Sequence, residues 1–373
     1  MPKLTTVVSR AVNSAKFLLD IAASGAAIAT VLGFAGSLWW VFELIEHLRP
    51  QYCLVLVTAL VIGGISRRTW SFVWCLPLAL NLALLAPLFF ASAQGSYLEQ
   101  ANHIPGSTFR LLYANLDHSN KDTSQAIRYI EGQNADLVLL QEVTSRWLTT
   151  LESNLSRYRV VTSFPKEDST GLAMLVPIAP SKSLELVATQ IIALPPYSGQ
   201  PLVETTLRWE GTEVVILGLS IIRPQSRDSS AFQDVEFDAA AEWSLRQQRE
   251  YKREVVVIGD FNSTPWSGRF RSFLHESALH NSQQGFGLQP TWPAGFPSVL
   301  KIAIDHCLHS KSITTINRAT GFNIGSDHLP LFVELRFGNA HSSSSTGRNL
   351  DSRQLLKPCQ PICIPSDLKV PLS

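Results

Sequence analysis

Two long stretches without a charged side chain constrain this chain of 373 residues more than any other feature. Residues 21–42 contain no Asp, Glu, Lys or Arg, and residues 69–98 contain none either. A helix that crosses the hydrocarbon core of a bilayer needs about 20 predominantly apolar residues, so each stretch is long enough to cross it. A third uncharged stretch, residues 51–66, is shorter, and it is followed by two arginines that could reach the bilayer surface.

We predict an anchor over residues 1–98 with about three transmembrane helices, at roughly 19–42, 50–66 and 70–93. A buried helical hairpin in a soluble domain is the alternative for the middle stretch. Residues 91–93 read Ala-Ser-Ala, as at a signal-peptidase site, but the apolar stretch before them is too long and too late for a signal peptide. We therefore expect the anchor to be retained, with a cleaved and released domain as the alternative.

Basic residues flank the three stretches unevenly. Three precede the first stretch and two separate the second from the third: Lys3, Arg10, Lys16, Arg67 and Arg68. Only Arg49 lies between the first and the second. Because Lys and Arg concentrate in cytoplasmic loops, three spans place the amino terminus in the cytoplasm and everything after about residue 95 outside it. With two spans, the large domain would lie in the cytoplasm instead.

The soluble part, residues 99–337, contains 21 basic and 25 acidic residues. This balance lacks the basic surface of a protein that grips a nucleic-acid backbone, although it does not exclude a nuclease whose metal supplies positive charge. Residues 338–373 are rich in Ser and then in Pro, which predicts a flexible tail. Within this tail, Cys359 and Cys363 could form a local disulfide or remain unpaired thiols.

Strand-like patterns outnumber helical ones in the soluble part. We expect strands at residues 107–115, 135–140, 158–163, 171–176, 184–192, 202–209, 212–220, 254–259, 298–308 and 329–337. Helices are expected at residues 123–131, 143–155, 231–252 and 266–274. Many strands with few helices predict packed sheets flanked by helices.

Polar residues follow several of these strands at the point where each strand ends. The clearest case is Glu254–Pro265, EVVVIGDFNSTP, in which four β-branched residues form a buried strand and Asp260 and Asn262 come after it. Loops at one edge of a layered α/β fold commonly build its functional site. We therefore expect seven side chains to converge: Asn115, Glu142, Asp260, Asn262, Asp305, Asp327 and His328.

These residue types suit the hydrolysis of a phosphate ester. Glu142, together with a second carboxylate, offers the hard oxygen ligands that Mg²⁺ prefers. Asp260 could orient and deprotonate an attacking water. His328 suits acid/base chemistry on a phosphate, with Asp305 as the partner that decides which ring nitrogen faces the substrate. The two asparagines could donate to phosphate oxygens as charge develops on them.

Four motifs occur in an order that resembles the endonuclease/exonuclease/phosphatase superfamily: NADLVLLQEV, VVVIGDFNSTP, IDHCLHS and GSDHLPLFVEL. The resemblance covers roughly residues 107–337. It implies a four-layer α/β sandwich, in which helices flank two packed and mainly antiparallel sheets, here preceded by transmembrane helices. It also implies Glu142 and Asp327 as metal ligands, Asp260 as the water-activating residue, and His328 as the phosphate-contacting histidine paired with Asp305. Asn115 and Asn262 would position the phosphate or the water.

The sequence around WSGRF and TWP also resembles a membrane-anchored bacterial branch of this superfamily. The resemblance implies a Mg²⁺-dependent or Mn²⁺-dependent hydrolase in a bacterial-type inner or plasma membrane, and the distribution of Lys and Arg favours an extracytoplasmic catalytic domain. The expected substrate is a phosphate ester in a nucleic acid, a phospholipid or a phosphorylated small molecule. We expect no obligate protein partner.

One position departs from the superfamily pattern. Many members have a His or Tyr after the middle strand, and here Ser220 aligns with it, in VVILGLSIIRPQS. His118 could partly replace the missing group, or it could be an ordinary loop histidine. Two hypotheses follow: an active phosphodiesterase or phosphatase, and a catalytically weakened domain that binds a phosphorylated ligand or partner.

Overall fold

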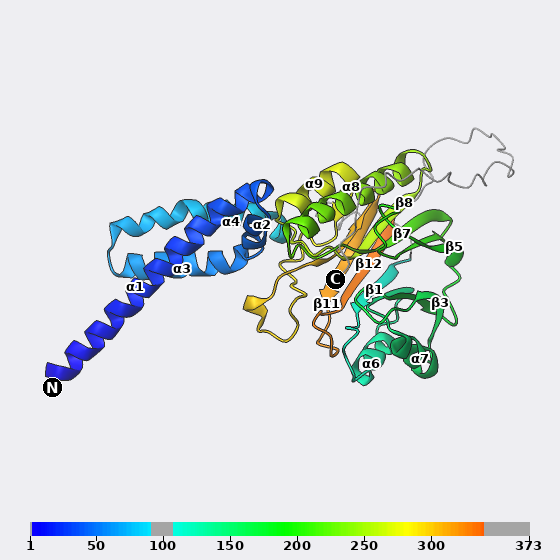
Figure 1. Cartoon of the computed structure of the whole chain (residues 1–373), viewed down its shortest axis with the longest axis horizontal. Coiled ribbons are helices and arrows are strands. Elements are labelled where there is room, and N and C mark those ends of the chain that lie inside the picture. Colours follow the sequence, from blue (N-terminus) through cyan, green and yellow to red (C-terminus); the bar gives the residue numbers. More distant parts are fainter. Residues whose placement is uncertain (1, 91–106, 339–373) are drawn as a thin grey trace. The chain divides into compact units, whose positions relative to one another are not determined.

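The computed structural model describes residues 2–90 and 107–338. The predictions for the tail, for its two cysteines and for the Ala-Ser-Ala sequence therefore lie outside the described residues. Within residues 2–90, all of the secondary structure is helical (Figure 1). The helices are α1 (Pro2–Leu32), η1 (Gly33–Leu38), α2 (Trp40–Glu46), α3 (Arg49–Ile65), η2 (Thr69–Trp74) and α4 (Cys75–Phe89).

Two helical segments, Val7–Gly36 and Thr69–Phe89, are long and apolar enough to cross a membrane. A third candidate is the pair α2 and α3, which passes the same test as a unit but is bent by 60°. Among the described residues, the number of candidate spans is therefore two, or three if the bent pair crosses as one. The predicted boundaries of the anchor and of its spans stay predictions.

Polar side chains join these helices to one another. The Asn81 amide donates to Thr30 Oγ1 at 2.7 Å, and its oxygen accepts from Arg49 Nη1 at 3.0 Å. All three side chains are fully buried. Such bonds between helices satisfy polar groups that would otherwise face an apolar environment, so α1, α3 and α4 are held as one bundle.

Residues 107–338 form two six-stranded sheets. The first has the order β11-β12-β1-β2-β4-β3 and the second the order β5-β6-β7-β8-β10-β9. Each sheet has one parallel pair, β1 with β2 and β7 with β8, and its other pairs are antiparallel. The strands are β1 (Phe109–Asn115), β2 (Leu137–Gln141), β3 (Tyr158–Phe164), β4 (Leu172–Pro177), β5 (Leu184–Ile192), β6 (Leu202–Trp209), β7 (Thr212–Ser220), β8 (Glu254–Asp260), β9 (His280–Asn281), β10 (Asp305–His309), β11 (Ile313–Thr320) and β12 (Leu331–Phe337).

Three apolar layers hold the two sheets and their helices together. The largest contains side chains from both sheets, such as Leu139 and Ile216, and lies between them. A second packs the outer face of the first sheet under α6 (Ser124–Gly132) and α7 (Ser145–Asn154). A third packs the second sheet under α8 (Arg227–Arg249) and α9 (Gly268–Ser277), as Figure 1 shows. The predicted four-layer sandwich, with sheets that are mainly antiparallel, is thereby confirmed.

Several elements differ from the prediction, among them the two-residue strand β9, which was not predicted. Strand β11 was not predicted, because ITTINRAT mixes polar and apolar residues without a clear alternation. The strand expected within residues 298–308, ending near Asp305, is instead a short 3₁₀ helix, η3 (Ser298–Leu300), followed by β10, which begins at Asp305. Helix α8 begins four residues earlier than predicted, because the side chains of Ser226 and Ser229 form a capping box at its start.

Candidate active site

The strand register brings the predicted polar residues to one edge of the two sheets. In the first sheet, Asn115 at the end of β1 lies beside Gln141, which directly precedes Glu142. In the second sheet, Asp260 at the end of β8 lies between Ser220 on β7 and Asp305 on β10. Because parallel strands end at the same edge, each sheet contributes carboxylates to that edge.

Asp260, Asp305 and His328 form a buried group. His328 Nδ1 lies 2.9 Å from Asp305 Oδ2, and neither side chain is exposed. One ligand-capable atom from each of the three residues lies within 4.8 Å of the others. The pairing of His328 with Asp305 is the geometry that the sequence analysis expected.

Burial and mutual repulsion shift the protonation of this group. Burial and, after it, the Asp305 carboxylate together raise the pKa of Asp260 to about 7, against the opposing charge of His328. Burial alone would lower the pKa of His328, but the carboxylates of Asp305, Asp260 and Asp327 raise it to about 10. At neutral pH the site therefore holds an imidazolium next to a carboxyl group that can accept or release a proton.

Asn262 turns toward the protein rather than toward the open edge. Its side-chain amide donates to the carbonyl of Ile221 at 2.8 Å and to Asp260 Oδ2 at 3.0 Å. Its backbone N–H donates to Asp260 Oδ1 at 2.8 Å. Both amide hydrogens are thus donated to protein oxygens, and the role expected for Asn262 in positioning the phosphate or the water stays a prediction. In this arrangement Asn262 holds the Asp260 carboxylate in one orientation.

Glu142 lies at the centre of a second group, contributed by the first sheet. The uncharged amide of Asn115 donates through Nδ2 to Glu142 Oε1 at 2.9 Å. His118 contacts Glu142 Oε2 twice, through its backbone N–H at 3.1 Å and through Nδ1 at 2.6 Å. Glu142 itself has a φ of 60°, a left-handed conformation that non-glycine residues adopt rarely and that often marks functional sites.

The hydrogen bond to Glu142 raises the pKa of His118, so the imidazole tends to be charged next to this carboxylate. Asp117, His118 and Glu142 each offer an atom within 4.8 Å of the others. The His118 side chain is 41% exposed, whereas Glu142 is buried. The structure thus places the His118 side chain in contact with Glu142, and its part in the chemistry stays a prediction.

Asp327 is the predicted residue that lies apart from both groups. Its Oδ2 accepts from Trp292 Nε1 at 3.1 Å, and its backbone carbonyl accepts from the Ala294 N–H at 2.7 Å. Asp327 belongs to neither of the clusters in which ligand atoms lie within 4.8 Å of one another. Its charge still reaches His328, whose pKa it helps to raise.

Arg223 is a site residue that sequence reasoning missed. Its Nη2 lies 3.9 Å from Glu142 Oε1, its positive charge lowers the pKa of Asp260, and its side chain is 44% exposed. The available signal was its place in the loop directly after β7, but only a His or Tyr was sought there. Ser220, which aligns with that missing residue, is the last residue of β7, and its Oγ accepts from Gln200 Nε2 at 3.2 Å.

The donor set fits a divalent cation. Three carboxylates are buried at this edge, and carboxylate oxygens are the usual ligands of Mg²⁺ and Mn²⁺. Asp305 Oδ1 and His328 Nε2 are buried polar atoms with no hydrogen-bond partner among the described residues. Buried polar atoms are normally paired, so two unpaired atoms in one cluster indicate that the site is completed by a ligand.

Comparison with known proteins supports a family assignment. The sequence pattern of the Endonuclease/Exonuclease/phosphatase family matches residues 112–328, more than half of the chain. A comparison with curated proteins found no match.

Several solved structures are similar to this chain. The endonuclease/exonuclease/phosphatase from Bacteroides vulgatus is 15% identical, with a TM-score of 0.50 over 62% of this chain and 99% of its own. Danio rerio TDP2, solved with a single-strand DNA product, is 14% identical, with a TM-score of 0.48 over 62% and 99%. The mannosyl-6-phosphatase of Bacteroides thetaiotaomicron is 15% identical, with a TM-score of 0.48 over 61% and 100%.

At these identities, the structural likeness shows the fold alone. The sequence pattern is more specific, because it begins within β1 and ends at His328, and so spans every strand end described above. Members of this family hydrolyse phosphate esters with divalent metal ions. This chain belongs to the endonuclease/exonuclease/phosphatase family.

Proposed function

We propose that this protein is a membrane-anchored, Mg²⁺-dependent or Mn²⁺-dependent phosphoesterase in which Asp260 activates the attacking water. The observation that carries the proposal is the buried group of Asp260, Asp305 and His328, placed at the same sheet edge as Glu142. A purely structural role would not explain it, because burying several carboxylates together without a ligand is unfavourable.

Asp260 is suited to act as the general base. Its pKa of about 7 lies near neutral pH, where a base is efficient. Asn262 donates to both of its oxygens, which holds the carboxylate in place. Asp260 would take a proton from the water that attacks phosphorus.

His328 would donate to a phosphate oxygen. Asp305 occupies its Nδ1, so the proton on Nε2 faces the ligand, and Nε2 has no protein partner among the described residues. With a pKa of about 10, the imidazole is charged at neutral pH and can offset the negative charge that builds on the phosphate. Arg223, half-exposed beside Glu142, would add a second positive group.

Glu142 would hold the metal ion, with Asp327 as the further carboxylate that the family resemblance implies. When bound, the ion would polarise the phosphate and neutralise part of its charge. Asn115 and His118 fix the orientation of the Glu142 carboxylate by bonding to its two oxygens.

The apolar helices would anchor the catalytic domain, and the distribution of Lys and Arg favours an extracytoplasmic location. A reporter that is active only in the cytoplasm, fused to the carboxyl terminus, tests this orientation. We expect no reporter activity. Clear activity would contradict the three-span topology.

The catalytic proposal is tested with the full chain in detergent micelles and bis-p-nitrophenyl phosphate as substrate, with Mg²⁺ or Mn²⁺. Removing a general base typically costs about 10²–10⁴-fold in rate, so we expect Asp260→Asn to lose activity by that factor. The matched control is Asp238→Asn, a charge change at an exposed position on α8. Equal rates for wild type and Asp260→Asn would refute the assignment.

The second candidate function is ligand binding without turnover, and Ser220 is the observation that favours it. If the wild type hydrolyses none of the phosphate esters offered but still binds them, a catalytically weakened binding domain is the correct description.

A further inference from the structure

The connection between β9 and β10 contains an exposed apolar loop. Residues 295–300, GFPSVL, are all exposed. Phe296 is 56% exposed, Val299 60% and Leu300 51%. Three large apolar side chains within five residues form a patch that water solvates poorly, and such patches commonly mark interaction sites.

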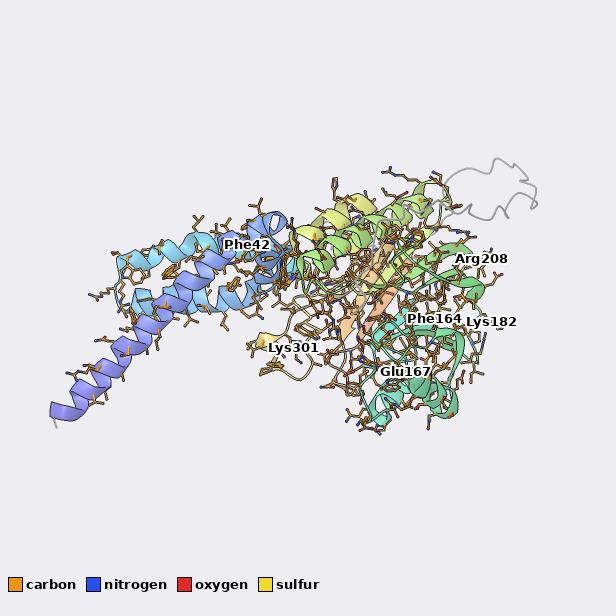
Figure 2. All side chains as sticks on the ribbon, in the orientation of Figure 1. Phe42, Phe164, Glu167, Lys182, Arg208 and Lys301 are labelled. Carbon is orange, nitrogen blue, oxygen red and sulfur yellow. The ribbon has the colours of Figure 1, made fainter. Side chains whose placement is uncertain are left out.

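Most of the same connection is uncharged. No Asp, Glu, Lys or Arg occurs in residues 277–300, and the first charged residue that follows is Lys301. Figure 2 labels Lys301 beside the short helix η3. Charged side chains are costly in a bilayer, and a single Lys at the edge of an apolar loop suits the negative surface of phospholipid head groups.

Hydrogen bonds tie this connection to the ends of two candidate membrane helices. Gln51 Nε2, in the first turn of α3, donates to the carbonyl of Val299 at 2.9 Å and to that of Lys301 at 3.3 Å. The Gly287 N–H donates to the carbonyl of Leu88, near the end of α4, at 2.8 Å. The loop therefore lies where these helices meet the catalytic domain.

Large apolar side chains are exposed on those helices from this point onward. On α3, Leu54, Val57 and Val61 are 57%, 42% and 54% exposed. At the end of α4, Phe89 and Phe90 are 54% and 72% exposed. An apolar surface on a membrane helix begins at the bilayer boundary, so the loop lies close to the level of that boundary.

The base of the loop reaches the candidate active site. Trp292 and Ile302 pair with each other through two backbone hydrogen bonds and close the loop. Trp292 Nε1 donates to the Asp327 carboxylate, and the backbone N–H of Asp305 donates to Thr291 Oγ1 at 3.3 Å. Only this short loop therefore separates the site carboxylates from whatever surface Phe296 contacts.

We propose that Phe296, Val299 and Leu300 insert into the interface of the bilayer that holds the helices, and that the site acts on a phosphate ester carried by a membrane lipid. The second half rests on the phosphoesterase function proposed above. The partner is the bilayer surface: the loop is uncharged and apolar, and it joins helices whose outer faces are apolar too. Insertion holds the edge of the two sheets that carries the site over the lipid head groups. The phosphate of a lipid therefore reaches the site while the lipid stays in the membrane.

Photo-crosslinking tests the membrane contact without any measurement of activity. The full chain carries p-benzoylphenylalanine at position 296 or 300, in nanodiscs of phosphatidylglycerol and phosphatidylethanolamine. The control position is Ile178, which is 57% exposed and follows β4 at the opposite edge of the first sheet. We expect a lipid mass adduct at 296 and 300 at least tenfold more abundant than at 178. Equal adduct yields at the three positions would overturn the contact.

Hydrolysis tests the substrate. In the triple variant F296S/V299S/L300S, we expect cleavage of phospholipid in vesicles of the same two lipids to fall at least tenfold. Cleavage of soluble bis-p-nitrophenyl phosphate should stay within twofold, because none of the three residues belongs to the site. A wild type that cleaves the soluble ester but no lipid overturns the lipid-substrate half. A wild type that cleaves neither overturns the phosphoesterase function, while crosslinking still decides the contact.

Discussion

Glu236 on α8 offers a sharp test of the electrostatics around the site. Its carboxylate is 2% exposed and accepts from the Ile222 N–H at 2.8 Å, in the loop that carries Arg223. Burial raises the pKa of Glu236 from its ordinary value of 4.5 to about 7. A raised pKa means that the native protein holds this proton more tightly than the unfolded chain does. The native state therefore favours the protonated form.

The sign and size of the effect on stability follow from proton linkage. Below pH 4.5, Glu236 is protonated in both the native and the unfolded state, so its burial does not reduce the free energy of unfolding. As the pH rises from 4.5 to 7, the unfolded chain ionises first, and native-state stability is lost. The penalty is about 1 kcal/mol at pH 5 and about 3 kcal/mol at pH 8. The change Glu236→Gln removes this penalty, since its amide oxygen can still accept from Ile222.

Thermal unfolding of the full chain in nanodiscs, followed by tryptophan fluorescence, measures the difference. For a domain of this size, about 3 kcal/mol corresponds to an increase of about 6–12 °C in Tm at pH 8. At pH 5 we expect an increase of only about 2–4 °C. The matched control is Glu242→Gln, an exposed position on the same helix that should change neither value. If Glu236→Gln and wild type lose stability equally between pH 5 and pH 8, burial of an ionised Glu236 is refuted.

Three further predictions concern the site and its support. Gly259→Ala should destabilise the domain by more than about 3 kcal/mol, because φ is 151° and the added Cβ would lie 1.8 Å from the Leu219 carbonyl oxygen. Denaturant unfolding measures this loss, and the control is Gly268→Ala, whose added Cβ has no atom within 4 Å. Mg²⁺ at about 100 times its Kd should stabilise the wild type by about 2.7 kcal/mol in thermal unfolding, and EDTA should reverse this; an undiminished effect in Glu142→Gln would argue against Glu142 as a ligand. Arg223→Gln should lower kcat/KM for bis-p-nitrophenyl phosphate about 10–100-fold, with partial recovery in Arg223→Lys. The control is Arg227→Gln, at an exposed position, and equal kcat/KM values for the two glutamine variants would exclude Arg223 from phosphate binding.

Much of the fold could be read from the sequence, because the signals are local. The run VVVI before Gly259 could only be a strand buried on both faces, and it lies in the core between α8 and the first sheet. The uncharged stretches predicted long apolar helices for the same reason: a bilayer or a core selects composition over some 20 residues. Strand β11 was missed because its burial depends on pairing with β12, which lies beyond a loop and is not encoded in ITTINRAT itself.

The candidate site likewise has parts that the local sequence predicted and parts that depend on contacts between distant segments. Asp260 was recognisable as the residue that ends its strand, and the sequence predicted the pairing of Asp305 with His328. Asp305 itself, expected near the end of a strand, is instead the first residue of β10, and His328 precedes β12. The orientation of Asn262 was not predictable, because it depends on a φ of 45° and on an acceptor, the Ile221 carbonyl, that the neighbouring strand supplies. The position of Arg223 beside Glu142 likewise requires the two sheets to meet at one edge.

The sequence by itself determined where this chain is apolar and which polar residues end its strands, because periodicity and composition act over a few neighbouring residues. Apart from the pairing of Asp305 with His328, only the tertiary structure decided which of those residues touch. Register places Ser220, Asp260 and Asp305 side by side, and packing brings Gln51 to a loop 250 residues away along the chain. The exposed Phe296 was an unremarkable loop residue in the sequence. It became a candidate membrane contact once the structure placed its loop against α3, since contacts between distant segments arise from packing and leave no local pattern.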